Sequence, residues 1–183
     1  AHVPGSVHLE ADTQLSNRIG FVFPPATPMI LILQDAIQYT QVVYSLARVG
    51  YDNVVGYLSE GLDVWEKMGL PLTAGDIKDV QPLELHQILQ NCTNGDCPRI
   101  VDVREPWEYK QGHVPGAVLI PLGQLSARLN ELDPEKSVAV ICASGNRSQS
   151  AAALLGQKGF KTVYNVSGGT GAWMHSGLEI ERS

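Results

Sequence analysis

Long apolar runs, basic clusters and cysteines are all scarce in this chain of 183 residues. No apolar stretch approaches the roughly 20 residues that a helix needs to cross a bilayer, and runs such as Met29 to Leu33 have the length of a strand. Lysine and arginine total 13, form no cluster and leave a net charge of −6. We therefore expect neither a membrane nor a nucleic acid as a partner, and a small anionic substrate would need a local positive site.

The cysteines are three in number, Cys92, Cys97 and Cys142, at spacings that do not indicate a disulfide framework. This usage, without a signal peptide, favours a reducing cytoplasm as the location. Cys92 and Cys97 lie in the polar stretch 91–98 and are able to pair or to bind metal, but no second ligand pair or histidine cluster accompanies them. We expect no metal and no cofactor. The chain starts at Ala1 rather than Met, which suggests that residues precede it.

Cys142 has a position that favours chemistry. It follows the apolar run 138–141 and begins the loop Cys142-Ala143-Ser144-Gly145-Asn146-Arg147, which leads into a predicted helix at Ser148. Backbone N–H groups that curl toward a helix N-terminus, together with the helix dipole, stabilise an anion. The thiolate is the reactive form of cysteine, and Arg147 adds a fixed positive charge. The alternative is a buried structural thiol that packs under the helix.

A repeat divides the chain. The turn His2-Val3-Pro4-Gly5-Ser6-Val7 recurs as His113-Val114-Pro115-Gly116-Ala117-Val118, at an offset of 111 residues by subtraction of the residue numbers. A buried strand, a Gly-aromatic pair and a tryptophan segment recur at similar offsets. The pattern predicts two related units: residues 1–72, a linker at 73–80, and residues 81–183.

The second unit alternates between strand and helix patterns, which indicates an α/β fold with a parallel sheet covered by helices on both faces. Catalytic loops of such folds lie at the carboxyl ends of strands, which is the place of Cys142. The predicted helices are 82–90, 125–132 and 148–158, with a last one through Trp173, and the predicted strands are 99–103, 118–120, 137–141 and 162–166. A polar turn with Trp107 is expected after the strand 99–103.

Four motifs of this unit, in order, resemble the rhodanese superfamily. They are Asp102-Val103-Arg104, Gly112-His113-Val114-Pro115-Gly116-Ala117, Cys142 to Ser148, and Gly168-Gly169 with Trp173. The resemblance implies a sulfurtransferase: Cys142 takes the outer sulfur of thiosulfate or a persulfide, carries it as a persulfide, and passes it to a thiol or cyanide.

The loop chemistry fits that implication. Amides from Ala143 to Arg147 form a ring suited to a terminal sulfur, and Gly145 permits a tight turn. Arg147 is suited to the sulfonate end of thiosulfate, and the hydroxyls of Ser144 and Ser148 add donors. We therefore predict Cys142 as the catalytic residue and Ala143, Ser144, Gly145, Asn146, Arg147 and Ser148 as substrate-binding residues.

Two other functions remain open. The first is a non-catalytic binding or sensing module in which Cys142 only accepts oxidation or sulfur. The second, phosphatase or arsenate reductase activity, is disfavoured because the related enzymes of this superfamily carry a loop one residue longer than the six residues from Cys142 to Arg147.

Other motif residues have structural interpretations. We expect His113 to fix its turn, because His2 repeats it in a unit without a nucleophile. Asp102 and Arg104 are expected to brace the loop framework. Trp107 and Trp173 are expected in the core more than at a pocket rim.

The first unit departs from the pattern at the site. Leu33 aligns with Cys142 and Gln38 with Arg147, so we expect an inactive rhodanese-like domain, incomplete at its N-terminus. Together with the stretch 16–21, this order of units is similar to the tail of fusions between a metallo-β-lactamase-fold persulfide dioxygenase and a rhodanese. That resemblance implies an upstream dioxygenase domain as a possible partner.

Overall fold

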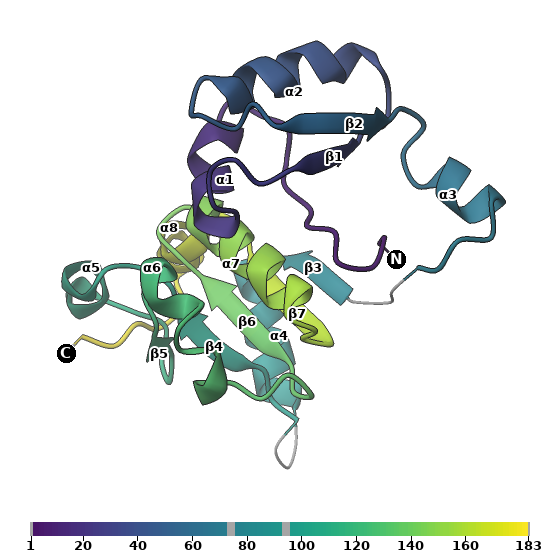
Figure 1. The fold of residues 1–183 in the computed structure, drawn as a ribbon. Helices are drawn as coiled ribbons and strands as arrows, with labels where there is room; N and C mark the ends of the chain where they lie inside the picture. The colour runs from purple at the N-terminus through teal and green to yellow at the C-terminus, as the bar shows by residue number, and fades with distance from the viewer. Residues whose placement is uncertain (1, 73–75, 93–95, 183) are drawn as a thin grey trace. The chain divides into compact units, whose positions relative to one another are not determined.

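The computed structural model describes residues 2–72, 76–92 and 96–182. The chain divides into two compact units, residues 1–74 and residues 75–183, and each is described by itself (Figure 1). Within the described residues no helix is both long and apolar enough to cross a membrane.

The second unit is built on a five-stranded sheet in the order β3-β7-β6-β4-β5, with every neighbouring pair parallel. The central strand β6 is buried along its whole length, as its run of small and branched apolar residues predicts. The strands are β3 (Asp76–Val80), β4 (Arg99–Asp102), β5 (Val118–Leu119), β6 (Val138–Ile141) and β7 (Thr162–Val166).

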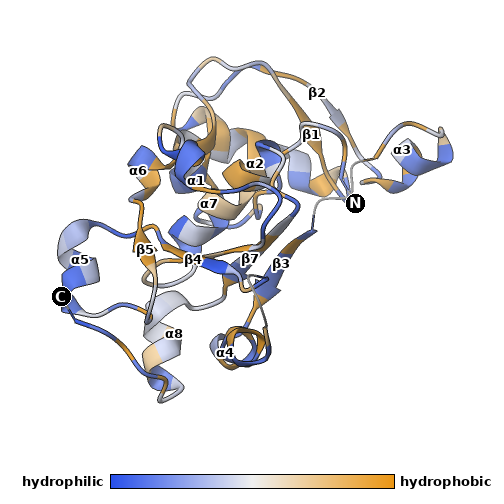
Figure 2. Cartoon of the chain, turned by 90° about the horizontal axis from the view of Figure 1, so that it is seen from below, coloured by the Kyte–Doolittle hydropathy of each residue, from blue (hydrophilic) through white to orange (hydrophobic). Residues whose placement is uncertain are grey.

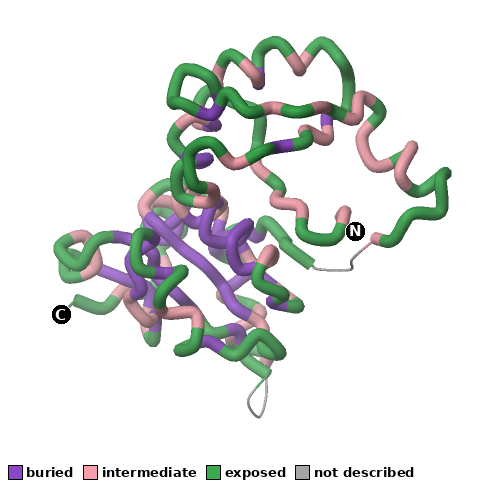
Figure 3. Tube along the Cα trace, in the orientation of Figure 1, coloured by how far each residue is buried: buried purple, intermediate pink, exposed green. Residues whose placement is uncertain are grey.

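Helices cover both faces of this sheet, as predicted (Figure 2). Alternate residues of β6 point to opposite faces: Val138 and Val140 join a core with α6 (Leu122–Leu125) and α7 (Asn146–Gln157). Ala139 and Ile141 join a second core with α4 (Pro82–Asn91) and α8 (Gly169–His175). Figure 3 shows this burial concentrated in β4, β6 and α7.

Three predictions for this unit were wrong. The expected linker 73–80 contains β3, which pairs with β7 from Asp76 to Val80, while residues 73–75 lie outside the described residues. Only Val80 of this strand is buried, so an edge strand formed by backbone pairing carries almost no apolar signal. The helix expected at 125–132 is α6 followed by a separate 3₁₀ turn, η1 (Leu129–Glu131). The polar turn expected around Trp107 is helix α5 (Pro106–Gln111).

The first unit has two parallel strands, β1 (Met29–Ile32) and β2 (Val54–Leu58). One hydrophobic cluster joins them to α1 (Leu15–Val22) and α2 (Ile37–Ala47). The third helix described in this unit, α3 (Asp63–Lys67), buries none of its residues, and Ile30 and Val55 are 70% and 63% exposed. A sheet covered on both faces is therefore a correct expectation for the second unit only.

Candidate active site

Cys142 lies where β6 passes into α7, at the carboxyl end of the central strand. Its side chain is buried, and the Gly145 N–H donates to its Sγ at 3.1 Å. Gly145 has a φ of +97° and is the residue immediately before α7, which begins at Asn146, two residues earlier than expected. The left-handed glycine turns the chain back toward the sulfur, so an anion at Sγ faces both an amide donor and the N-terminus of a twelve-residue helix.

The segment that begins with the Gly168-Gly169 motif packs against the Cys142 loop and hydrogen-bonds to its backbone. Thr170 N donates to Cys142 O at 2.7 Å, and Gly171 N donates to Ala143 O at 3.1 Å. A Cβ on Gly169 would lie 2.1 Å from the Cys142 carbonyl oxygen, and Gly169 also has a φ of +58°. No residue with a side chain fits there without displacing the loop, which gives a physical reason for this glycine in the motif.

The other loop residues have different surroundings. Ser144 and Asn146 are exposed, and Ala143 is half-buried. Ser148 is fully buried, and its hydroxyl donates to Gly145 O at 3.0 Å. The expectation that the Ser148 hydroxyl binds substrate is therefore not supported by its position; the hydroxyl stabilises the turn that positions the Gly145 amide.

Arg147 is engaged by a carboxylate from another helix. Its two terminal nitrogens donate to the two carboxylate oxygens of Glu108, each at 2.7 Å. The hydrogen bonds to Glu108 raise the pKa of Arg147, and the negative charges of Glu108, Cys142 and Asp102 act in the same direction. The same hydrogen bonds from Arg147 lower the pKa of the Glu108 carboxyl below its ordinary value. Arg147 lies at the loop as predicted, but it is not a free guanidinium.

Glu108 is a site residue that the sequence analysis missed. It lies on α5, where Pro106 occupies the first turn and Glu105 and Glu108 form a reciprocal capping box. The Glu105 N–H donates to Glu108 Oε2 at 3.0 Å, which orients the carboxylate that receives Arg147. The signal was present in the sequence, because a proline at the first helical position and a glutamate at the third helical position predict a helix start.

Asp102 and Arg104 form a buried ion pair at the carboxyl end of β4, and among the described residues their side-chain hydrogen bonds reach the turn at Gly112 rather than the Cys142 loop. The Arg104 Nε lies 2.9 Å from both oxygens of Asp102, and its Nη2 donates to Asp102 Oδ2 at 2.6 Å. The same Nη2 donates to Gly112 O at 2.8 Å. This joins the end of β4 to the turn that begins at His113.

His113 fixes its turn, as expected. Its backbone exchanges two hydrogen bonds with Glu181, and its ring stacks on Tyr109 with 3.6 Å between the centroids. Burial, together with the negative charges of Asp102 and Glu181, raises the pKa of Tyr109.

The two tryptophans of the motif region have different surroundings. Trp173 is buried in the core as expected, but Trp107 is 64% exposed, so the core expectation for Trp107 was wrong. Trp107 follows the helix-starting proline and faces solvent on α5.

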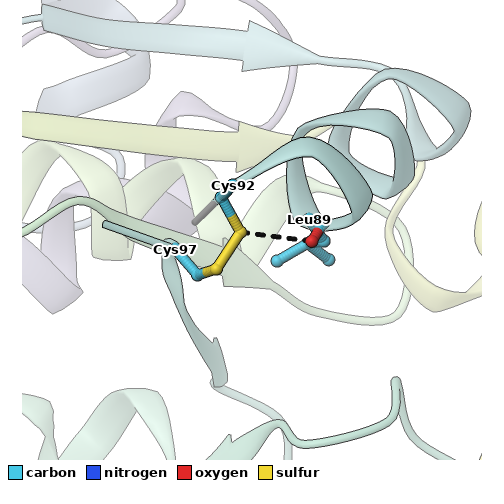
Figure 4. Close-up of a disulfide and its surroundings, with 3 residues drawn as sticks. All are labelled: Leu89, Cys92 and Cys97. Carbon is cyan, nitrogen blue, oxygen red and sulfur yellow. Dashed lines mark hydrogen bonds between the residues drawn. A yellow bond between two sulfur atoms is a disulfide. The ribbon is translucent and has the colours of Figure 1, made fainter. Parts of the chain in front are cut away.

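Cys92 and Cys97 form a disulfide, which corrects the inference from cysteine spacing (Figure 4). The pair links the residue after α4 to the approach to β4. The number and spacing of the cysteines test only for a framework of several disulfides, so they did not predict a single local pair. Across the described ranges, no group of three or more His, Cys, Asp or Glu residues is placed to hold a metal ion.

The second unit combines a parallel sheet that helices cover on both faces with a cysteine at the turn into α7, where a backbone amide donates to its sulfur. This combination is typical of sulfur-handling α/β domains. The family model "Rhodanese-like domain" matches residues 82–176. The chain therefore belongs to the rhodanese family.

Relatives agree with this assignment. A protein of Allochromatium vinosum named "Sulfurtransferase" is 34% identical over 101 residues, which cover 55% of this chain and 94% of that protein. The "Putative sulfur carrier protein YrkF" of Bacillus subtilis is 39% identical over 94 residues, 51% of each chain. This chain thus spans about half the length of that relative. The crystal structure of a rhodanese-like domain protein from Staphylococcus aureus matches with a TM-score of 0.51 at 32% identity, covering 58% of this chain and 98% of that one.

Proposed function

We propose that this chain is a rhodanese-type sulfurtransferase that moves sulfane sulfur from thiosulfate or a small persulfide to a thiol or cyanide through a persulfide on Cys142. The observation that carries the proposal is the 3.1 Å hydrogen bond from the Gly145 N–H to the Cys142 Sγ at the N-terminus of α7. The rhodanese family and a relative named as a sulfurtransferase support sulfur transfer in general.

The proposed cycle has two displacements at sulfur. The Cys142 thiolate attacks the outer sulfur of the donor, an S–S bond forms, and the donor's own S–S bond breaks. Its electron pair leaves with sulfite when the donor is thiosulfate, or with a thiolate when the donor is a persulfide. The acceptor then attacks the outer sulfur of the Cys142 persulfide, and the Cys142 thiolate is regenerated. The Gly145 amide and the dipole of α7 stabilise the anionic sulfur at both stages.

The ion pair of Arg147 bears on the choice of donor. The sulfonate of thiosulfate is negatively charged and would be bound best by a cation. The guanidinium of Arg147, however, already donates to both oxygens of Glu108. A persulfide needs only the sulfur cradle of the loop amides, among them Ala143, Gly145 and Asn146. Exposed Ser144 adds a hydroxyl at the loop mouth. The amides rather than a free arginine thus form the core of the proposed binding site.

Steady cyanide turnover tests the proposal. With thiosulfate or glutathione persulfide as donor, the chain is expected to produce thiocyanate continuously, and Cys142→Ser is expected to abolish the production. The double variant Cys92→Ser and Cys97→Ser is the matched control, since it removes both cysteines outside the loop without leaving an unpaired thiol, and it is expected to keep the turnover. Turnover that survives in Cys142→Ser would contradict the assignment of the nucleophile.

A non-catalytic sensing module is the alternative, favoured by the burial of Cys142, which is only 1% exposed. It predicts a single sulfur transfer to Cys142 without thiocyanate turnover. Phosphatase chemistry, the least favoured alternative, predicts phosphate release from an aryl phosphate.

We infer further that the first unit is an inactive relative of the second. The elements β1, α2, β2 and α3 follow the same order as β6, α7, β7 and α8, and Leu33 follows β1 as Cys142 follows β6. A partnership with a persulfide dioxygenase rests on the sequence resemblance alone. The cytoplasmic location stays an expectation, and the Cys92–Cys97 disulfide does not strengthen it, since stable disulfides are typical of oxidising compartments.

A further inference from the structure

We propose that Cys92 and Cys97 form a second sulfur site, which exchanges disulfide for dithiol with a small anionic thiol that binds beside Arg99 and Lys136. The inference does not depend on the chemistry of Cys142.

The two sulfurs of the disulfide differ in their surroundings (Figure 4). Cys97 is an exposed residue, whereas Cys92 is half-buried at the C-terminal end of α4. The Cys92 Sγ lies 3.1 Å from the Leu89 carbonyl oxygen. A carbonyl at a helix C-terminus opposes a thiolate but accepts a hydrogen bond from a thiol. The Cys97 sulfur is therefore the one open to attack. The Cys92 sulfur, once it is a protonated thiol, has the Leu89 carbonyl oxygen as a hydrogen-bond acceptor.

A pocket of about 400 Å³ opens beside Cys97. Arg99 and Lys136 supply positive charge to it, and neither forms an ion pair with a carboxylate of the described residues. Three carboxylates neighbour lining residues: Asp96, next to Cys97 in the chain; Glu181, whose Oε2 lies 3.5 Å from the Gly116 nitrogen; and Glu135, next to Lys136 and paired with Lys161. The pocket is lined by Leu89, Cys97, Pro98, Arg99, Ile100, Pro115, Gly116 and Lys136.

The chemistry of the lining selects the ligand class. Two unpaired cations beside an exposed disulfide sulfur suit a molecule that carries a carboxylate at one end and a thiol at the other. The apolar lining from Leu89, Pro98 and Pro115 suits a short carbon chain between these groups. A chain of net charge −6 otherwise repels anions, so this local positive patch decides which thiols approach the disulfide.

This site is separate from the Cys142 loop. Arg99 begins β4 and pairs with Val138 at the start of β6, whereas Cys142 follows the far end of β6. Four residues of strand at about 3.3 Å each place the two sites roughly 13 Å apart along the sheet. A thiol in the pocket therefore reacts with Cys97 without meeting the Cys142 loop.

The exchange balances without another reactant. The thiolate of the ligand attacks the Cys97 Sγ, a mixed disulfide forms, and the Cys92–Cys97 bond breaks with its electron pair on the Cys92 Sγ. Cys92 takes a proton from water and its S–H donates to Leu89 O. A second ligand thiolate attacks the ligand sulfur of the mixed disulfide, and Cys97 leaves as a thiolate. Two thiols are oxidised to one disulfide while the protein disulfide is reduced to a dithiol.

The test compares two thiols on the full chain in the Cys142→Ser background, so that its outcome is independent of sulfur transfer at Cys142. The probes are mercaptopropionate, which is anionic, and mercaptoethanol, which is neutral; alkylation and peptide mass analysis follow each reaction. We expect the first adduct on Cys97. Replacing both Arg99→Gln and Lys136→Gln is expected to slow mercaptopropionate by about threefold to tenfold at low salt and to leave mercaptoethanol unchanged.

The matched control is the pair Lys67→Gln and Lys110→Gln, which changes the net charge equally at exposed positions outside the pocket. It is expected to leave the rates of both thiols nearly unchanged. A first adduct on Cys92, or equal slowing of both thiols by the pocket substitutions, would overturn the proposal. Equal slowing of mercaptopropionate by the control pair would also overturn it, because the selection would then come from net charge alone.

Discussion

Arg147 and Glu108 lie 39 residues apart in the sequence and meet through two parallel hydrogen bonds of 2.7 Å each. The pair ties the first turn of α7, which carries the Cys142 loop, to α5, which carries no other residue of the proposed site. The pair orients the N-terminus of α7. At the same time the Glu108 carboxylate engages the guanidinium of Arg147, which is the positive charge of the loop.

Glu108→Gln is expected to improve the use of thiosulfate. The amide keeps an acceptor for one Arg147 nitrogen but removes the negative charge that competes with the sulfonate. The KM for thiosulfate should therefore fall by about threefold or more, while the KM for a persulfide donor without a sulfonate or carboxylate group should change less. Steady-state kinetics with both donors measures the difference.

Glu84→Gln is the control, because it removes the same charge from an exposed glutamate of α4, outside the proposed site. A KM for thiosulfate that rises in Glu108→Gln would show that the ion pair builds the anion site rather than occupying it.

The same pair predicts a pH dependence of stability. The folded pKa of Glu108 is lowered, chiefly by its hydrogen bonds to Arg147, so the unfolded chain binds more protons there. This contribution is fully present above the ordinary glutamate value of about 4.3 and is lost as the pH falls through the folded pKa. Urea unfolding of the wild type and of Glu108→Gln should give curves whose separation shrinks below about pH 4. A separation that grows on acidification would contradict the sign.

Gly169→Ala is expected to disrupt the site. Its Cβ would lie 2.1 Å from Cys142 O and 2.7 Å from the Ala143 carbonyl carbon, and the positive φ adds strain. We expect a loss of more than about 2 kcal/mol of unfolding free energy, with thiocyanate production lost as well. Gly123→Ala is the matched control: nothing lies within 4 Å of its Cβ, and alanine in helix α6 should be neutral or slightly stabilising. Thermal melts of both variants decide the matter, and a Gly169→Ala melt like that of the wild type would show that the backbone contact is not needed.

Ser148→Ala and Ser144→Ala are expected to differ in their effect on the free energy of unfolding. Removing the buried Ser148 hydroxyl leaves the Gly145 carbonyl without that donor, at a cost of about 1 kcal/mol. Ser144 is exposed, so its replacement should leave the unfolding free energy unchanged within about 0.5 kcal/mol. Chemical denaturation measures both, and a larger cost for Ser144→Ala would show a structural role that its exposure does not suggest.

The local chemistry of the Cys142 loop was predictable because its signals are contiguous. An apolar strand, a glycine and a helix start follow one another within twenty residues, and the structure places each element there. Long-range partners were not predictable in this way: nothing near Arg147 in the sequence identifies Glu108, and the edge strand β3 derives its structure from backbone pairing with β7. The Cys92–Cys97 disulfide joins the residue after α4 to the approach to β4, and a single local pair gives no framework signal in the sequence.

The mass of the peptide that contains Cys142 tests the central claim most directly. The full chain is treated with thiosulfate or glutathione persulfide, separated from the donor, and digested without reductant. We predict the gain of one sulfur atom on Cys142, and its loss when cyanide is added. A Cys142 peptide that stays unmodified with both donors, in a chain that remains folded, would contradict the account.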